Sequence, residues 1–279
     1  MNIDIDINND FLDENDLNEH KFNWKKFFII LSIIFLFIIC AIVYSRYKST
    51  SGLKIYEYKI TDSSLPDSFH GVKIVQFSDI YYGNTVNSDY LSFIVSEINK
   101  LKPDIVVYTG DFSDNQISQD EKKQIIDILS SINSTIGKYS ISGDIDDISL
   151  FDDIFKSSGF TILKNNSVDV YYKGNTPIVI SNQDISSDFF NILLIHQPDV
   201  IDKFENKFNL VLSGHSLNGQ INIPFIKNLF LHNGSKKYIN GYYVANGNPL
   251  YVSNGIGTTS FKYRLFNKPS VSLFRLTKY

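Results

Sequence analysis

Five short apolar segments of this 279-residue chain lead into a residue type that binds metal ions. The clearest lies within residues 209–220 (NLVLSGHSLNGQ), where a branched apolar run stops at a serine and a glycine before His215. Such a run is typical of a strand buried on both faces. In open α/β sheets, ligands bind at the carboxyl ends of the strands, because loops converge there without disturbing the core. We therefore expect His215 at an edge where functional groups gather.

The other four segments repeat this pattern. They are KIVQF (73–77) before Asp79, DIVVY (104–108) before Asp111, YSIS (139–142) before Asp144, and ILLI (192–195) before His196. Taken singly, an aspartate after a strand is more often a turn or cap residue than a ligand, and a lone histidine is no stronger evidence of a metal site. Five in series, all expected on one edge of one sheet, favour a metal site.

The amino-terminal part has a different composition. Residues 1–22 are rich in Asp, Asn and Glu and are predicted to form a disordered acidic tail. Residues 27–44 carry no charge and are almost wholly Ile, Leu, Phe and Val, long enough to cross a hydrocarbon core of about 30 Å with slight help from their flanks. We interpret residues 23–47 as one transmembrane anchor, since a long acidic tail ahead of it does not suit a cleaved signal peptide. Lysine and arginine flank both sides evenly, so their count does not orient the span.

Residues 53–279 are expected to form one globular domain. Apolar residues at helical spacing near 91–101 and 125–132 alternate with the first strands, as in a βαβ sheet. After Gly159 the chain becomes rich in short β-like runs, with a helix expected near 199–204. The formal net charge of -4 at pH 7 gives no basic surface for nucleic acid, which we exclude as a partner.

Together, these motifs resemble those of the calcineurin-like metallophosphoesterases, especially a membrane-anchored or exported bacterial branch. That family has Asp-x-His, Gly-Asp, Gly-Asn-His-Asp/Glu, a single His and Gly-His-x-His in this order. The counterparts here are SDIY (78–81), Gly110-Asp111, GDID (143–146), His196 and GHSL (214–217), and the segment 250–276 is also similar to that branch. The resemblance implies an α/β fold: a metallophosphoesterase-type β-sandwich flanked by helices, here preceded by one transmembrane helix.

The departures from the family pattern fall mainly on one of its two metal sites. Carried over, the first site would consist of Asp79, Tyr81, Asp111 and Leu217, in which two imidazoles are replaced. This site should be weak or empty.

The second site keeps four competent residues. They are Asp111, Asp144 in place of the family's Asn, His196 and His215. The resemblance thus implies one firmly bound divalent ion, with Mn, Zn, Fe and Mg not distinguished, and a metal set of Asp79, Asp111, Asp144, His196 and His215.

The function that follows is a membrane-anchored phosphoester or pyrophosphate hydrolase with weak activity. In the family, two ions about 3.5–4 Å apart share the attacking hydroxide, and a histidine, here Ile145, assists the leaving group. We therefore assign no catalytic residue. The expected partners are the membrane and a phosphorylated small molecule or lipid, with the domain outside the cytoplasm at the cell membrane. The alternative is a catalytically inactive member that binds a ligand or partner. A third hypothesis, a metal-free nucleotide-binding module, has less support, because no glycine-rich phosphate fingerprint follows a strand.

Several other polar residues receive plainer interpretations. Asp146 and Asp147 are predicted to form a turn, and His70 and His232 to lie in surface turns. Arg264 is expected either to meet a phosphate or to pair with a surface carboxylate.

Overall fold

The computed structural model describes residues 22–224 and 231–279, so all but the last residue of the predicted acidic tail lies outside the described residues. The first element is α1 (Trp24–Val43), which continues as a π-helical turn over Tyr44–Lys48. Among the described residues, Trp24–Lys48 is the one helix long and apolar enough to cross a membrane. The chain from Ile42 onward forms a separate compact unit.

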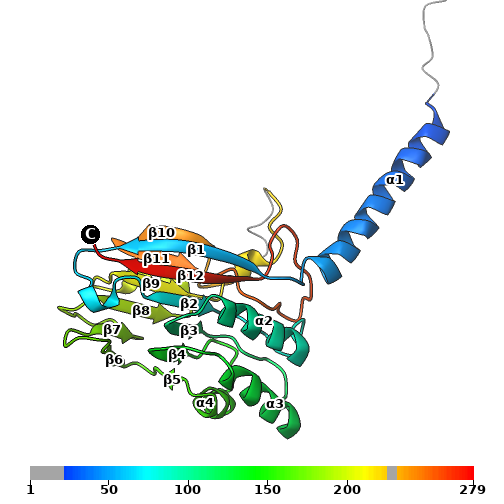
Figure 1. Cartoon of the computed structure of the whole chain (residues 1–279). Helices are drawn as coiled ribbons and strands as arrows, with labels where there is room; N and C mark the ends of the chain where they lie inside the picture. Colours follow the sequence, from blue (N-terminus) through cyan, green and yellow to red (C-terminus); the bar gives the residue numbers. More distant parts are fainter. Residues whose placement is uncertain (1–21, 225–230) are drawn as a thin grey trace, which may run out of the picture. The chain divides into compact units, whose positions relative to one another are not determined.

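The described residues of this unit form two six-stranded sheets (Figure 1). The first sheet has the order β1-β12-β2-β3-β4-β5 and the second has the order β10-β11-β9-β8-β7-β6. The strands of the first sheet are β1 (Lys54–Thr61), β12 (Ser270–Thr277), β2 (Lys73–Phe77), β3 (Ile105–Thr109), β4 (Gly137–Ile141) and β5 (Thr161–Ile162). Those of the second are β10 (Gly241–Ala245), β11 (Asn248–Val252), β9 (Leu210–Ser213), β8 (Asn191–Ile195), β7 (Ile178–Ser181) and β6 (Ser167–Val170). Strands β2 to β5 run parallel to one another, as do β7, β8, β9 and β11.

The central strands β2 and β3 of the first sheet are buried on both faces, which explains why they read as continuous apolar runs. In β2, Ile74 packs in the cluster between the two sheets, whereas Val75 packs against the helices. Neighbouring residues alternate in this way because successive side chains of a strand point to opposite faces. The helices on the outer face are α2 (Ser88–Lys100), α3 (Gln119–Ser130) and α4 (Ile148–Ser157).

This architecture confirms the expected β-sandwich flanked by helices and preceded by one apolar helix. The expectation that all five apolar runs end on one sheet was wrong. Strands β2, β3 and β4 belong to the first sheet, but β8 and β9 belong to the second. Their carboxyl ends still meet, because the sheets stack with these ends at the same rim: Gln76 Nε2 donates to the Ser213 carbonyl at 2.9 Å across the sandwich.

Helices α2 and α3 lie where their spacing predicted them, and the helix expected near 199–204 is a short 3₁₀ segment, Pro198–Lys203. Helix α4 was not predicted. It begins at Asp147, whose carboxylate accepts from the Leu150 peptide N–H at 2.9 Å, and it buries Phe151, Ile154 and Phe155. Asp147 is thus the N-cap of a helix, where the sequence predicted a turn.

Candidate metal centre

Asp111 follows β3 and is held by the loop after β4. The carboxylate of Asp146 accepts from three peptide N–H groups, those of Asp111 (3.1 Å), Phe112 (2.7 Å) and Gly143 (2.7 Å). A Cβ at Gly143 would overlap Asp111 Oδ1, so this close approach requires glycine. Asp146 is thus a turn residue, as expected, and its turn clamps the two loops that carry the site.

His196 follows β8 and is oriented by the neighbouring sheet. Its Nδ1 lies 2.7 Å from the carbonyl oxygen of Thr109, at the end of β3. A carbonyl only accepts hydrogen bonds, so Nδ1 carries a proton, and in the neutral ring Nε2 presents a lone pair. That Nε2 lies 3.1 Å from Asp111 Oδ1.

His215 follows β9 and is oriented in the same manner from a different loop. Its Nε2 lies 2.6 Å from the carbonyl oxygen of Asn233, which assigns the proton to Nε2 and leaves Nδ1 bare. Nδ1 lies 3.2 Å from His196 Nε2 and 3.4 Å from Asp144 Oδ2. Two backbone carbonyls therefore turn both rings so that their lone pairs face the same point.

Three acceptor atoms thus converge, with no neutral donor between them from the part of the chain that the structure describes: Asp111 Oδ1, His196 Nε2 and His215 Nδ1. Such a cluster needs a cation, either a proton or a metal ion. The spacings of 3.1 and 3.2 Å fit ligands on one ion, because donors about 2.0–2.1 Å from a metal lie about 3.0–3.4 Å apart. One carboxylate and two imidazoles suit Zn, Mn or Fe. Backbone carbonyls on the outer ring nitrogens are the usual support of metal-binding histidines.

The electrostatics of the metal-free centre also indicate that it binds a cation. Burial alone would raise the pKa of the Asp111 carboxyl, but the hydrogen bond and charge of His196 outweigh it and lower that pKa to about 2. Burial likewise opposes protonation of His196, yet its bond to Asp111 raises the pKa of the imidazole to about 9. The centre is therefore arranged to hold positive charge.

Asp144 lies at the solvent side of this group. Its side chain is 47% exposed, and Gln197 Nε2 donates to its Oδ2 at 2.5 Å. Among the described residues, the tight group of candidate ligands is Asp111, His196 and His215, and Asp144 approaches it through His215.

Asp79, the fifth predicted ligand, is not in the tight group. Its side chain is fully buried, Oδ1 accepts from the His215 peptide N–H at 2.9 Å, and Oδ2 accepts from the Ser78 hydroxyl. Burial raises the pKa of this carboxyl to about 7. Asp79, Asp111 and His215 have positive φ angles of 54°, 60° and 69°, a strained conformation for non-glycine residues that often marks functional sites.

Tyr81 and Leu217 fill the space beside Asp79 and the far oxygen of Asp111. The Tyr81 hydroxyl donates to Asp111 Oδ2 at 2.7 Å. Burial, then the charges of Asp111 and Asp79, raise the pKa of Tyr81, which stays a neutral phenol. Leu217 is fully buried, and a Cβ at Gly255 would lie 2.5 Å from Leu217 Cδ2 and 2.9 Å from Asp79 Cβ.

Comparison with known proteins agrees with this arrangement. No family model matches the chain. The uncharacterized metallophosphoesterase YkuE of Bacillus subtilis (strain 168) is 30% identical over 253 residues, which cover 84% of this chain and 88% of the relative. The chain belongs to the calcineurin-like metallophosphoesterase family.

Two further relatives support the assignment. The uncharacterized metallophosphoesterase Cj0846 of Campylobacter jejuni is 28% identical over 277 residues, which cover 90% of this chain and 72% of the relative. A protein of Danio rerio named as a transmembrane protein with metallophosphoesterase domain is 26% identical over 261 residues, 82% of this chain and 59% of the relative. The family resemblance of the motifs is thereby confirmed.

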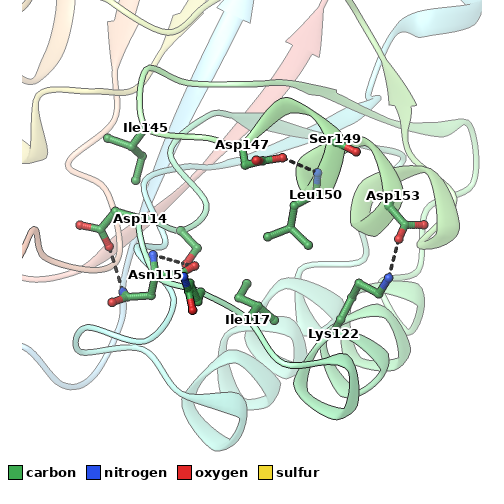
Figure 2. Close-up of a pocket in the computed structure, with 11 residues that line it drawn as sticks. Asp114, Asn115, Ile117, Lys122, Ile145, Asp147, Ser149, Leu150 and Asp153 are labelled. Carbon is green, nitrogen blue, oxygen red and sulfur yellow. Dashed lines mark hydrogen bonds and ion pairs between the residues drawn. The ribbon is translucent and has the colours of Figure 1, made fainter.

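In this metallophosphoesterase, a surface cavity adjoins the loops that carry the site. It has a volume of about 640 Å³ and is lined by residues 113–117, Lys122 of α3, the start of α4 and Ile145 (Figure 2). Lys122 Nζ pairs with Asp153 Oδ2 at 2.7 Å on its far side. The peptide N–H of Ile145 donates to Asp111 Oδ1 at 3.2 Å, while its apolar side chain lines the cavity. The family's histidine position is therefore occupied by a side chain without a proton to give.

Two residues differ from their sequence interpretation. His232 is not a simple surface turn residue: it is half-buried, with its ring centroid 5.8 Å from that of His215. Arg264 is fully buried, and its guanidinium donates to the carbonyls of Asn254 (3.1 Å) and Gly257 (2.9 Å). Both expectations for Arg264, a phosphate and a surface carboxylate, were wrong, because the side chain does not reach the surface. Only the Asn-Gly turn after His232 was visible in the sequence, and it does not reveal contacts with a distant loop.

Proposed function

We propose that this protein is a membrane-anchored metallophosphoesterase that holds one divalent ion firmly and hydrolyses phosphoesters or pyrophosphates weakly. The ion's ligands in this proposal are Asp111, His196 and His215, with Asp144 completing the set from the solvent side. The observation that carries it is the convergence of three acceptor atoms, with both imidazoles turned toward one point by backbone carbonyls.

A divalent ion in this centre would supply Lewis-acid chemistry, drawing charge from a phosphoryl oxygen and acidifying a water. The chain's own residues would orient that chemistry. Thr109 and Asn233 hold the two rings, and Asp146 holds the loop that carries Asp111. Nothing at Ile145 protonates a leaving group, and loss of a general acid costs about 100-fold to 10,000-fold in rate. Weak activity follows from this loss.

A second ion is disfavoured by the groups around Asp79. Both oxygens of that carboxylate already accept hydrogen bonds from the protein, and Tyr81 donates to the oxygen of Asp111 that does not face His196. Leu217 offers no ligand atom. The same substitutions favour the second candidate, a catalytically inactive member that keeps the ion and binds a ligand or partner.

Restoring the three missing imidazoles distinguishes the weak enzyme from the catalytically inactive member. We expect the combined variant Tyr81→His, Ile145→His and Leu217→His to hydrolyse bis(p-nitrophenyl) phosphate with Mn²⁺ about 100-fold faster than the parent. The matched control is Tyr81→Phe, Ile145→Leu and Leu217→Met, with both variants checked for cooperative unfolding. A parent that is already fast would contradict the proposal. A slow parent activity lost in Asp111→Ala supports the weak enzyme, and a parent that binds an ion without turnover supports the inactive member.

Membrane attachment rests on α1 and its apolar sequence. Two relatives, from Danio rerio and Bos taurus, are named as transmembrane proteins, and this supports the same arrangement. We propose a single-pass protein of the cell membrane whose globular unit lies outside the cytoplasm and acts on a phosphorylated small molecule or lipid rather than nucleic acid. Protease digestion of intact spheroplasts tests the orientation: the globular unit should be cleaved, and protection of this unit would contradict the proposal.

A further inference from the structure

The chain just after the apolar run is bonded to a distant loop, residues 254–268, which we call the C-terminal loop. The Arg264 peptide N–H donates to the Ser45 carbonyl at 3.1 Å, and the Ser45 hydroxyl donates to the Arg264 carbonyl at 2.8 Å. Both residues are buried. The uncharged apolar run ends at Tyr44, one residue before this contact. The C-terminal loop is therefore bonded to the residue that directly follows the uncharged apolar run.

Large aromatic side chains project from this region into solvent. Phe266 is 70% exposed, Phe261 is 49% exposed, and Tyr47, beside Ser45, is 68% exposed. Three exposed aromatic rings therefore lie on two segments that are bonded to each other, and burial within this unit does not explain them. Aromatic residues at this position are typical of the boundary between lipid and water.

The two segments that carry these aromatic residues contain basic residues but no acidic ones. Residues 24–56 contain no Asp or Glu, and neither do residues 206–279, although the whole chain has a formal net charge of -4. Lys48 and Lys268 are exposed and Lys262 is half-buried. Basic residues near a membrane are attracted to anionic lipid headgroups by about 1 kcal/mol each.

We propose that residues 44–48 and the C-terminal loop form a membrane-contacting surface, seated in the headgroups of the anionic bilayer that α1 crosses. This inference rests on the proposed membrane attachment. If α1 spans the bilayer, the bonds of Ser45 keep Arg264 within a residue or two of the end of the span. Phe261, Phe266 and Tyr47 then enter the interface.

This surface is connected to the candidate metal centre through the same loop. The peptide N–H groups of Ile256 and Gly257 donate to the Asp79 carbonyl at 3.2 and 2.7 Å. Asn267 Nδ2 donates to the Leu217 carbonyl. The C-terminal loop is therefore bonded both to the end of the apolar run and to the loops that carry the centre.

Tryptophan quenching in vesicles tests the contact with the full chain. Trp24→Phe removes the only tryptophan. Single tryptophans are then introduced as Phe266→Trp in the loop, as Phe35→Trp within α1, and as Tyr171→Trp as a matched control. Tyr171 is 59% exposed and follows β6, whose antiparallel pairing with β7 puts that end at the opposite rim of the sandwich. The vesicles contain phosphatidylcholine and phosphatidylglycerol, with bromine placed either shallow or deep in the acyl chains.

We expect shallow bromine to quench Phe266→Trp more than deep bromine does, deep bromine to quench Phe35→Trp, and neither to quench Tyr171→Trp. Quenching of Phe266→Trp should weaken when phosphatidylglycerol is omitted. If Phe35→Trp is quenched but Phe266→Trp behaves like Tyr171→Trp, the contact is refuted and the anchor stands. If Phe35→Trp is not quenched, attachment fails and the contact fails with it.

Discussion

Binding of a divalent ion to the candidate centre should strengthen steeply with pH, because a proton occupies the same position. In the metal-free protein, the bond to Asp111 raises the pKa of His196 to about 9 against burial, so His196 is protonated at pH 7. An ion binds the deprotonated imidazole and must displace that proton. Between pH 7 and pH 8.5, the deprotonated fraction rises about 25-fold, which corresponds to about 2 kcal/mol of binding free energy. Apparent affinity should rise by this factor and level off above pH 9.

Competition with a chromophoric chelator measures this dependence for Zn²⁺ or Mn²⁺ at fixed ionic strength. The matched control is Asp111→Asn, which removes the carboxylate that raises the pKa of His196 and shifts proton competition toward the ordinary histidine range. This variant should bind more weakly and show a flatter pH dependence above pH 7. An affinity of the parent that does not change between pH 7 and pH 8.5 would refute the reasoning, as would an equal slope in both proteins.

Urea unfolding of the full chain in detergent tests three further features. Asp146→Ala leaves three peptide N–H groups without their acceptor and should lower the free energy of unfolding by about 3 kcal/mol; a loss below about 0.5 kcal/mol would contradict the clamp. Phe155→Ala should cost about 3–5 kcal/mol because its fully buried ring packs against other aromatic residues, whereas Phe266→Ala, at a 70% exposed site, should cost less than about 0.5 kcal/mol; equal losses would contradict this packing. Arg264→Met should cost about 3 kcal/mol by leaving buried carbonyls unpaired, and a neutral effect would contradict the importance of these bonds.

The strands that carry the candidate site were predictable because they are buried on both faces. A run such as KIVQF in β2 or LVLS in β9 shows its burial directly in its composition. The same property hides the sheet to which a strand belongs, so the residues alone suggested one sheet, and only the family resemblance implied a sandwich. Helix α4 was missed although its buried residues, Phe151, Ile154 and Phe155, have the i, i+3, i+4 spacing of an amphipathic helix.

The candidate ligands were predictable by type and position, but their roles were not. Each of Asp111, His196 and His215 follows a recognisable strand, and the structure brings these three together. Which nitrogen of each ring faces inward depends on the carbonyls of Thr109 and Asn233, which lie far away in the sequence. Contacts between distant loops leave no local pattern, and the same is true of the buried positions of Asp79, His232 and Arg264.

The stoichiometry of bound metal tests the central claim most directly. The full chain, purified in detergent and stripped with chelator, would be titrated with Mn²⁺ and Zn²⁺ and analysed by elemental mass spectrometry beside Asp111→Ala. We predict one tightly bound ion per chain and none in the variant. Two tightly bound ions would contradict the claim, because other residues would then have rebuilt the site that Tyr81 and Leu217 fill; no bound ion would contradict the centre itself.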